Sequence, residues 1–339
     1  MNYCDQSDNE DTTEDRKYFR VFISTKRLLK IFSDFKVVHA DATYKLIWQG
    51  MPVMVVGITD CDRHFHPSGL AVCCDETTAD FKFIFQSLVD GATKINLQLN
   101  PEYLVSDASN AIPNGFLQVF GEDKILIICW AHMCHNVTKK IESLVERRFQ
   151  DEVKRDIDTL QICSSENIFD KTKELFIKKW TQKGQQQFVD YISNQWFTSH
   201  KNWYEGGAHQ TPSTNNALES FNSVIKKEET CMYENGNRVL KPSTTIELRQ
   251  WTKAYQWAKC NLQVTSVKNE NSVTYFCPAN EEVSVSQEDI LNVTEMRWNT
   301  FDQFKKRAFK IWIVTLPDNK ENWMNGRCTC PSFFKEYIC

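Results

Sequence analysis

The feature that most limits how this chain can fold is a change of hydrophobic periodicity near His132. Before His132, short runs rich in Val, Ile and aromatic residues alternate with turn residues, a pattern typical of strands. The predicted strands are Tyr18–Ser24, Lys36–Ala40, Met51–Thr59, Leu70–Cys74, Tyr103–Ser106 and Lys124–Cys129, with helices at Thr78–Val89 and Ala111–Phe120. This order of elements predicts an α/β fold in which a mixed sheet is flanked by helices.

After His132 the apolar residues recur with helical spacing for about seventy residues. An apolar stripe runs from Ile141 to Leu160, a second helix is capped near Ser165, and a third carries Phe188 and Trp196. The pattern predicts an all-helical insertion that interrupts the α/β core. The predicted plan is an acidic disordered tail at 1–16, the first part of the core at 17–136, the insertion at 137–210, the final part of the core at 211–260, a linker and accessory segment at 261–325, and a short cysteine-bearing segment at 326–339.

Within the last third of the chain the elements are less regular. The pattern there predicts a Trp-rich helix at Glu247–Cys260, a polar linker at Ser266–Ser286, a helix near Gln287–Asn292 and a strand at Ala308–Leu316.

Composition excludes several classes of protein. With 41% hydrophobic residues, Lys+Arg 40 and Asp+Glu 44, the chain is neither a disordered tail nor a polybasic peptide. Its apolar runs are strand-sized, far below the ~18 residues needed to cross a bilayer, so we expect no membrane association. Met1–Asp15 lacks the features of a signal peptide, which predicts a reducing compartment. Disulfides are therefore not expected among the 13 cysteines.

Two aspartates stand where ligand-binding side chains often lie. Asp41 and Asp107 each close a predicted strand, and strand ends in α/β sheets open onto the crevice that binds ligands. An Asp at such a position can equally begin a turn or cap a helix. We interpret Asp60 and Asp62, which follow the strand Met51–Thr59, as turn residues.

A third acid, Glu219, lies on the predicted helix Thr214–Lys227. Helix geometry places it opposite the apolar stripe, in one row with Asn215 and Asn222. Such a row is typical of a solvated face, but it could also overlook an active site. Three carboxylates from distant positions can hold two Mg²⁺ ions, which activate the attacking oxygen and stabilise the leaving oxygen in phosphodiester chemistry.

Four short motifs carry a family resemblance: His-Ala-Asp-Ala-Thr-Tyr-Lys at 39–45, Val-Ser-Asp-Ala at 105–108, Cys-Trp-Ala-His at 129–132, and Thr-Asn-Asn-Ala-Leu-Glu-Ser-Phe-Asn at 214–222. Together, over roughly Tyr18 to Lys227, they resemble the transposases of Mutator-like elements. The resemblance implies a ribonuclease-H-like core with the catalytic triad Asp41, Asp107 and Glu219, which binds Mg²⁺ or Mn²⁺. It also implies an enzyme by ancestry that cuts double-stranded DNA at element ends and joins the 3′ ends to new DNA. We further expect a homo-oligomer, a nuclear location and no small-molecule substrate.

The motif Cys129-x-x-His132 matches a family element that lies close to the catalytic pocket. The resemblance implies that His132 could orient a substrate phosphate or assist proton transfer. Two alternatives remain open at this stage. The pair could be half of a zinc site completed by a distant partner such as Cys73 or Cys74, or Cys129 could be a buried structural residue.

The end of the chain carries Cys328, Cys330 and, as the last residue, Cys339. This spacing resembles the SWIM-type zinc finger that follows many transposases of this family, whose pattern is Cys-x-Cys, a spacer, then Cys-x-His. The sequence stops two residues before that His. The segment 326–339 is therefore predicted to be a partial finger that binds Zn²⁺ if a fourth ligand is supplied.

The charge pattern does not show the basic surface that is typical of a DNA-binding enzyme. The chain is slightly acidic overall, with a formal net charge of −4, and its basic pairs are typical of solvated helix faces. The alternative to an active transposase is a domesticated or decayed copy that acts as a non-catalytic nuclear DNA-binding or regulatory protein. A nuclease of general specificity is a third class.

Overall fold

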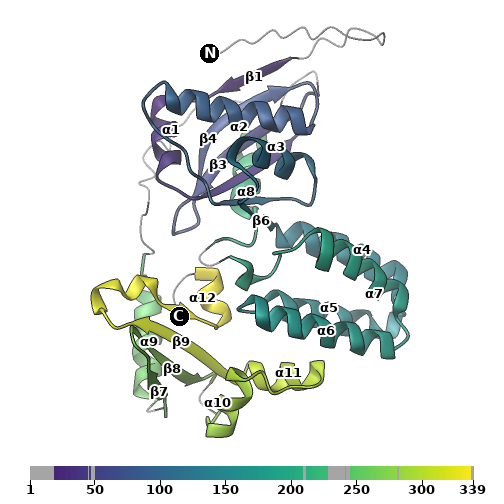
Figure 1. Ribbon diagram of the computed structural model, residues 1–339, viewed down its shortest axis with the longest axis vertical. Coiled ribbons are helices and arrows are strands. Elements are labelled where there is room, and N and C mark those ends of the chain that lie inside the picture. The colour runs from purple at the N-terminus through teal and green to yellow at the C-terminus, as the bar shows by residue number, and fades with distance from the viewer. Residues whose placement is uncertain are drawn as a thin grey trace. The chain divides into compact units, whose positions relative to one another are not determined.

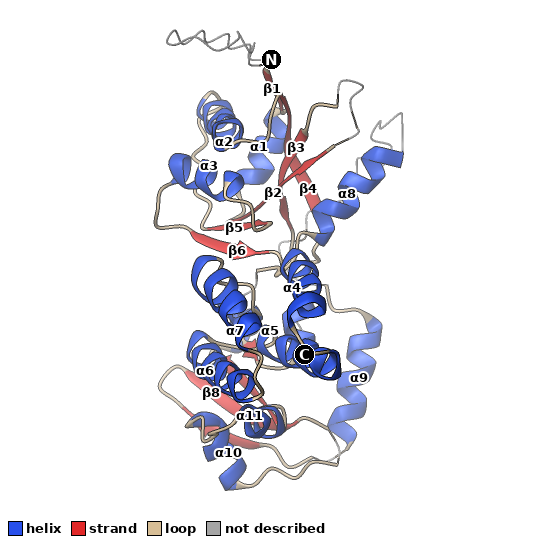
Figure 2. Cartoon of the chain, turned by 90° about the vertical axis from the view of Figure 1, so that its right-hand side faces the viewer, coloured by secondary structure: helices blue, strands red, loops and turns tan. Residues whose placement is uncertain are grey.

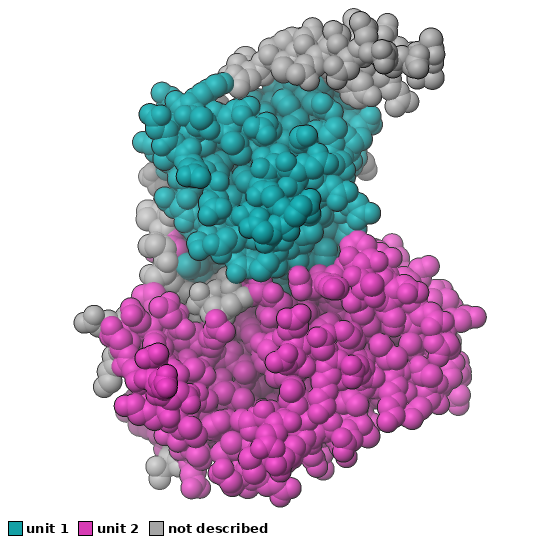
Figure 3. Space-filling model, in the orientation of Figure 1, with its two compact units in different colours: residues 1–133, 213–240 teal, residues 134–212, 241–339 magenta. Residues whose placement is uncertain are grey.

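The computed structural model describes residues 19–44, 46, 50–208, 211–227, 241, 245–260, 262–280 and 282–336. The predicted tail at 1–16 and Cys339 lie outside these residues. The chain divides into two compact units, one made of residues 1–133 and 213–240 and the other of residues 134–212 and 241–339 (Figure 3). The first unit is therefore built from two separate stretches of sequence.

A six-stranded mixed sheet forms the centre of the first unit (Figures 1 and 2). Its order is β1 (Arg20–Ile23), β4 (Phe65–Cys73), β3 (Val53–Thr59), β2 (Val37–Thr43), β5 (Tyr103–Ser106) and β6 (Ile125–Ile128). The first four strands are antiparallel neighbours, whereas β2, β5 and β6 run parallel. The prediction of an α/β fold with a mixed sheet is confirmed.

Helices cover both faces of this sheet. On one face, α1 (Lys26–Ser33), α2 (Thr78–Thr93) and α3 (Ala111–Phe120) enclose the main apolar core, which includes Met54 and Val56 of β3. Because side chains alternate along a strand, Val55 points to the other face, where it packs against Leu218 of α8 (Asn216–Lys227). Figure 2 shows α8 on the side of the sheet opposite α1, α2 and α3. The sheet thus lies between α8 and the three other helices.

Close packing of α2 on α3 depends on Gly115. A Cβ at this position would lie 2.7 Å from the Cβ of Phe81 and 2.8 Å from the backbone nitrogen of Lys82. Any larger residue would push the two helices apart.

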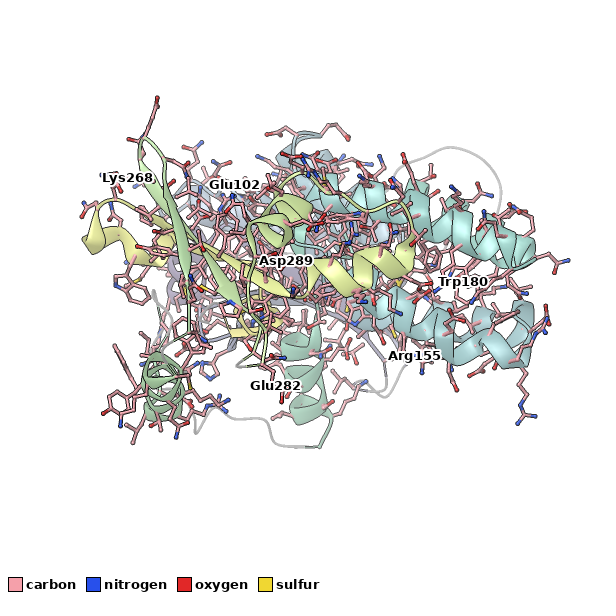
Figure 4. The ribbon with its side chains drawn as sticks, turned by 90° about the horizontal axis from the view of Figure 1, so that it is seen from below. Glu102, Arg155, Trp180, Lys268, Glu282 and Asp289 are labelled. Atoms are coloured by element: carbon pink, nitrogen blue, oxygen red, sulfur yellow. The ribbon has the colours of Figure 1, made fainter. Side chains whose placement is uncertain are left out.

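The second unit combines helices with a smaller sheet. Its helical part contains most of α4 (Trp130–Leu144), which begins in the first unit, then a 3₁₀ turn (Arg147–Phe149), α5 (Gln150–Gln161), α6 (Glu166–Gln182), α7 (Gln186–Ile192), a π-helical turn (Ser193–Ser199) and a 3₁₀ turn (Glu205–Gly207). Trp180 of α6 is fully buried among these helices (Figure 4).

The later part of the second unit contains α9 (Leu248–Lys259), β7 (Thr265–Lys268), β8 (Ser272–Pro278), α10 (Gln287–Thr294), α11 (Phe301–Ala308), β9 (Ile311–Pro317), a 3₁₀ segment (Lys320–Asn325), β10 (Arg327–Cys328) and α12 (Pro331–Glu336). The four strands form an antiparallel sheet in the order β10, β9, β8, β7.

The structure corrects several predicted elements. The stretch Ser266–Ser286, predicted as a linker, contains strand β8 and most of β7. Helix α1 was not predicted, and Ala308 ends α11 rather than beginning a strand. The apolar stripe from Ile141 to Leu160 belongs to two helices, because α4 ends at Leu144 and α5 begins at Gln150. Among the described residues, no helix is both long enough and apolar enough to span a membrane.

Candidate active site

The parallel pairing of β2 with β5 brings two of the predicted acids together. Val37 lies opposite Tyr103 and His39 opposite Val105 in this pairing. Asp41 and Asp107 each come two residues after that last pair, so the two aspartates leave neighbouring strands at the same level and on the same face. Asp41 lies inside β2, which runs three residues further than predicted, whereas Asp107 directly follows β5.

A buried network centred on Asn215 fixes the start of α8 to the sheet. The Asn215 Oδ1 atom lies 2.8 Å from Nδ1 of His39, and its Nδ2 donates a hydrogen bond to the carbonyl oxygen of Ala40 at 3.2 Å. The backbone N–H of Asn215 donates to Sγ of Cys129 at 3.3 Å. One residue therefore connects β2, the end of β6 and α8.

His39 is the functional-site residue that the sequence did not single out. Its ring is fully buried, and its Nε2 atom lies 3.0 Å from Oγ1 of Thr59 in addition to the contact with Asn215. Burial lowers the pKa of His39 to about 4, so the ring is neutral at neutral pH. The signal in the sequence was its place two residues before Asp41 on a strand, which puts both side chains on one face of the sheet.

Helix α8 places the third acid beside the two aspartates. Glu219 lies one helical turn after Asn215, whose carbonyl oxygen accepts its backbone N–H at 2.9 Å. One turn further along this row, Nδ2 of Asn222 donates to Oδ2 of Asp41 at 3.2 Å. Asn215 and Asn222 are buried, so the interpretation of this row as a solvated face is wrong for both of them.

The electrostatics of Asp41 show that the three carboxylates interact. Burial, followed by the negative charge of Asp107, raises the pKa of Asp41 to about 7, and the charge of Glu219 adds to this rise. The nearby His132 acts in the opposite direction. A carboxyl group with this environment is stabilised when a cation binds beside it.

Cys129 and His132 lie at the edge of the same pocket. Cys129 is buried between β6 and α4, and His132 is on the first turn of α4 with its Nε2 atom 3.7 Å from Oε1 of Glu219. The Cys129 side chain, followed by the charges of Glu219 and Asp107, raises the pKa of His132 to about 9 against the effect of burial. Ligand atoms of Cys129, His132 and Glu219 all lie within 4.8 Å of one another. The described residues do not add Cys73 or Cys74 to this group.

The residues around the aspartates fit a hydrated divalent cation. Asp41, Asp107 and Glu219 supply carboxylate oxygens, the ligands that Mg²⁺ prefers together with water. Two buried oxygens beside the aspartates, Oδ1 of Asn222 and Oγ of Ser109, have no hydrogen-bond partner. Ser109 also donates its backbone N–H to Oδ1 of Asp107 at 3.0 Å. Metal-bound water would give both oxygens a donor.

The cysteines near the end of the chain form a separate local structure. Cys328 and Cys330 are buried together with Phe333. The backbone N–H of Cys330 donates to Sγ of Cys328 at 3.4 Å, and that of Phe333 donates to Sγ of Cys330 at 3.4 Å. Cys339 lies outside the described residues, so zinc binding by this trio stays a prediction.

The fold and the pocket together define an α/β domain that presents three carboxylates at the junction of two parallel strands and a helix. Residues 37–136 match the model of the MULE transposase domain. The chain therefore carries a MULE transposase domain, and the resemblance to Mutator-like transposases is confirmed over this stretch. The match includes Asp41, Asp107 and His132, whereas Glu219 lies beyond it. No curated protein matched the chain.

Proposed function

We propose that this chain is the catalytic core of a Mutator-like DNA transposase with a ribonuclease-H-like domain. In this proposal it cuts the phosphodiester bonds at the ends of its element and joins the freed 3′ ends to new DNA. The observation that carries the proposal is the contact of Asn222 with Asp41. Together with the β2–β5 register, this contact brings Glu219 of α8 to the side of the sheet where Asp41 and Asp107 emerge.

In the proposed mechanism each residue of the pocket has a distinct task. Asp41, Asp107 and Glu219 hold the divalent cations, and Asn222 fixes one oxygen of Asp41 so that the other is free to bind. The bound cations, Mg²⁺ or Mn²⁺, supply activation of the attacking oxygen and stabilisation of the leaving oxygen. His132, which is protonated at neutral pH because its pKa is raised to about 9, attracts and orients a phosphate of the DNA.

The family match makes DNA the expected partner. We propose that the substrate is double-stranded DNA, that the chain works in the nucleus as a homo-oligomer, and that Cys328, Cys330 and Cys339 bind Zn²⁺ when a fourth ligand is present. The exposed side chains of Leu248, Trp251 and Tyr255 on α9 support self-association, because they present an apolar strip to solvent.

The proposal is tested by replacing one aspartate of the pocket. We expect Asp107→Asn to lower Mg²⁺- or Mn²⁺-dependent cleavage of duplexes that carry the element's own ends by at least about a hundredfold, because a metal ligand is lost. The matched control is Asp123→Asn, since the Asp123 side chain is 77% exposed and lies after α3, away from the pocket.

Three outcomes of this assay would contradict the proposal. Cleavage that is unchanged in the Asp107 variant would show that the pocket is not the catalytic site. Specific binding of the end sequences by the wild-type chain without cleavage would favour the non-catalytic DNA-binding protein. Cleavage of unrelated duplexes at the same rate would indicate a nuclease of general specificity.

A further inference from the structure

The group Cys129, His132 and Glu219 combines three different kinds of metal ligand. These ligands are a thiol, an imidazole and a carboxylate. One ligand atom from each residue lies within 4.8 Å of the other two. Cys129 directly precedes α4, His132 lies on the first turn of that helix, and Glu219 lies on the first turn of α8. The three ligands therefore lie at the starts of two helices.

The spacing between His132 and Glu219 is close to that of two ligands of one ion. The separation of 3.7 Å between Nε2 of His132 and Oε1 of Glu219 is too long for a hydrogen bond. Ligands of a tetrahedral zinc ion, at bond lengths of about 2.0–2.3 Å, lie roughly 3.5 Å apart. The whole group needs to contract by about 1 Å to reach this geometry, and the 42% exposed side chain of Glu219 has room to move.

Two further observations point to a ligand at this position. The Nδ1 atom of His132 is buried and has no hydrogen-bond partner, so this ring nitrogen is open to a bound cation. The sulfur of Cys129 accepts a hydrogen bond from the backbone N–H of Asn215 at 3.3 Å. This bond orients the sulfur and leaves it able to bind a metal ion. In metal centres, hydrogen bonds of this kind orient the residues that bind the metal.

The chemistry of the donors selects the class of metal. Mg²⁺ prefers oxygen ligands only, whereas a set of sulfur, nitrogen and oxygen suits Zn²⁺ and related transition metals. Three protein ligands leave one position open for water or for an oxygen of a phosphate. This site is thus different in ligand type from the all-carboxylate set of Asp41, Asp107 and Glu219.

We propose that Cys129, His132 and Glu219 form a binding site for a single zinc-class transition metal ion with one open coordination position. The site does not depend on transposase activity. A zinc-class ion bound here displaces the proton that His132 otherwise carries. Because Glu219 belongs to both sets of ligands, the ion also withdraws Glu219 from the two aspartates.

The test uses Co²⁺ as the probe on the full-length protein, without DNA. Cobalt bound to a thiolate absorbs in the near ultraviolet, so the ligand set is measured independently of cleavage. Cysteines near the end of the chain can also bind Co²⁺, and for this reason the measured quantity is the difference between variants. We expect Cys129→Ser and His132→Asn each to bind one Co²⁺ per chain less tightly by at least about tenfold, with loss of the matching thiolate absorption for Cys129→Ser.

The matched control is Cys134→Ser, because Cys134 lies on the same helix but is not a member of the group. Its stoichiometry and absorption should equal those of the wild type. If Cys129→Ser does not fold, as judged by circular dichroism, Glu219→Gln carries the test, since the Glu219 side chain is 42% exposed. Equal Co²⁺ binding by the wild type and by all three variants of the group would overturn the proposal. A loss of DNA cleavage alone has no bearing on it.

Discussion

The side chain of Asn215 bonds to two residues of β2, and its backbone bonds to the sulfur of Cys129. Glu219 follows one helical turn later, so its position depends on how firmly Asn215 is held. His39 depends on the same contact, since it is fully buried and neutral. At the scale of single residues, the pocket is therefore built by uncharged buried groups that position the charged ones.

We expect Asn215→Ala to lower the free energy of unfolding of the first unit by about 1–3 kcal/mol, because Nδ1 of His39 is left buried without a partner. The measurement is urea unfolding followed by circular dichroism. Ser223→Ala is the control, because Ser223 lies on the same helix but is exposed. An effect no larger than that of Ser223→Ala would show that the network does not stabilise the fold.

Asp41 gives a prediction about pH. Its pKa is raised to about 7, above the value of an unfolded chain, so between these two values the folded protein binds a proton that the unfolded protein has lost. Stability without metal should therefore fall as pH rises through this window. We expect Asp41→Asn to remove this fall and to stabilise the metal-free protein at neutral pH by on the order of 1–3 kcal/mol.

Thermal melting with a chelator and with Mg²⁺ measures both effects of this substitution. Mg²⁺ should raise the melting temperature of the wild type and leave that of Asp41→Asn nearly unchanged, because only the wild type presents the full set of carboxylates. A wild-type melting temperature that is constant from pH 4 to 7 without metal would contradict this view of Asp41.

At the scale of elements, boundaries marked by local signals were predictable and pairings between distant segments were not. Strand β5 and helix α3 begin and end at the predicted residues. Strand β8 was missed because it is mostly half-buried and lies within a stretch rich in Ser, Asn and Glu, and it is defined by pairing with β9. Helix α1 buries only Leu29 and Phe32, too short a stripe to stand out.

The same division holds for the pocket. The three acids could be named from sequence motifs because each motif is local. The roles of His39 and Asn215 could not, because these residues are 176 positions apart and meet only through the fold. The burial of Asn222 is likewise a consequence of how α8 packs on the sheet, which helical periodicity alone does not determine.

Three helices of the second unit are joined by one buried carboxylate. Asp156 of α5 is fully buried and accepts hydrogen bonds from Lys179 of α6 and from Lys305 of α11, both at 2.7 Å. We expect Asp156→Ala to destabilise this unit by about 3–5 kcal/mol, because the Lys179 side chain is only 10% exposed and its ammonium group loses the negative charge of Asp156. Tryptophan fluorescence reports the unfolding, to which the buried Trp180 contributes with its ring 5.4 Å from Nζ of Lys179.

The control for this substitution is Asp170→Ala on α6, where the carboxylate is 53% exposed and pairs with Lys173. An exposed pair of this kind contributes little to stability. Equal effects of the two substitutions would contradict the role given to Asp156.

At the scale of the whole molecule, each unit has a core of its own. The first is the apolar cluster between the sheet and α1, α2 and α3, and the second contains the buried aromatic residues Phe176, Trp180, Trp196 and Trp203. We expect two transitions on unfolding. Asn215→Ala should shift one of them and Asp156→Ala the other, as scanning calorimetry would show, whereas a shift of a single common transition by both would indicate one cooperative unit.

The discontinuous sequence of the first unit determines when its pocket is completed during translation. The ribosome adds Glu219 112 residues after Asp107, which at roughly 5–20 residues per second is a delay of roughly 6–20 s. Until α8 emerges, the face of the sheet that carries Val55 and Phe65 has no cover from Leu218. A nascent chain thus holds two acids and an apolar surface for several seconds, and it acquires the third acid only when that surface is covered.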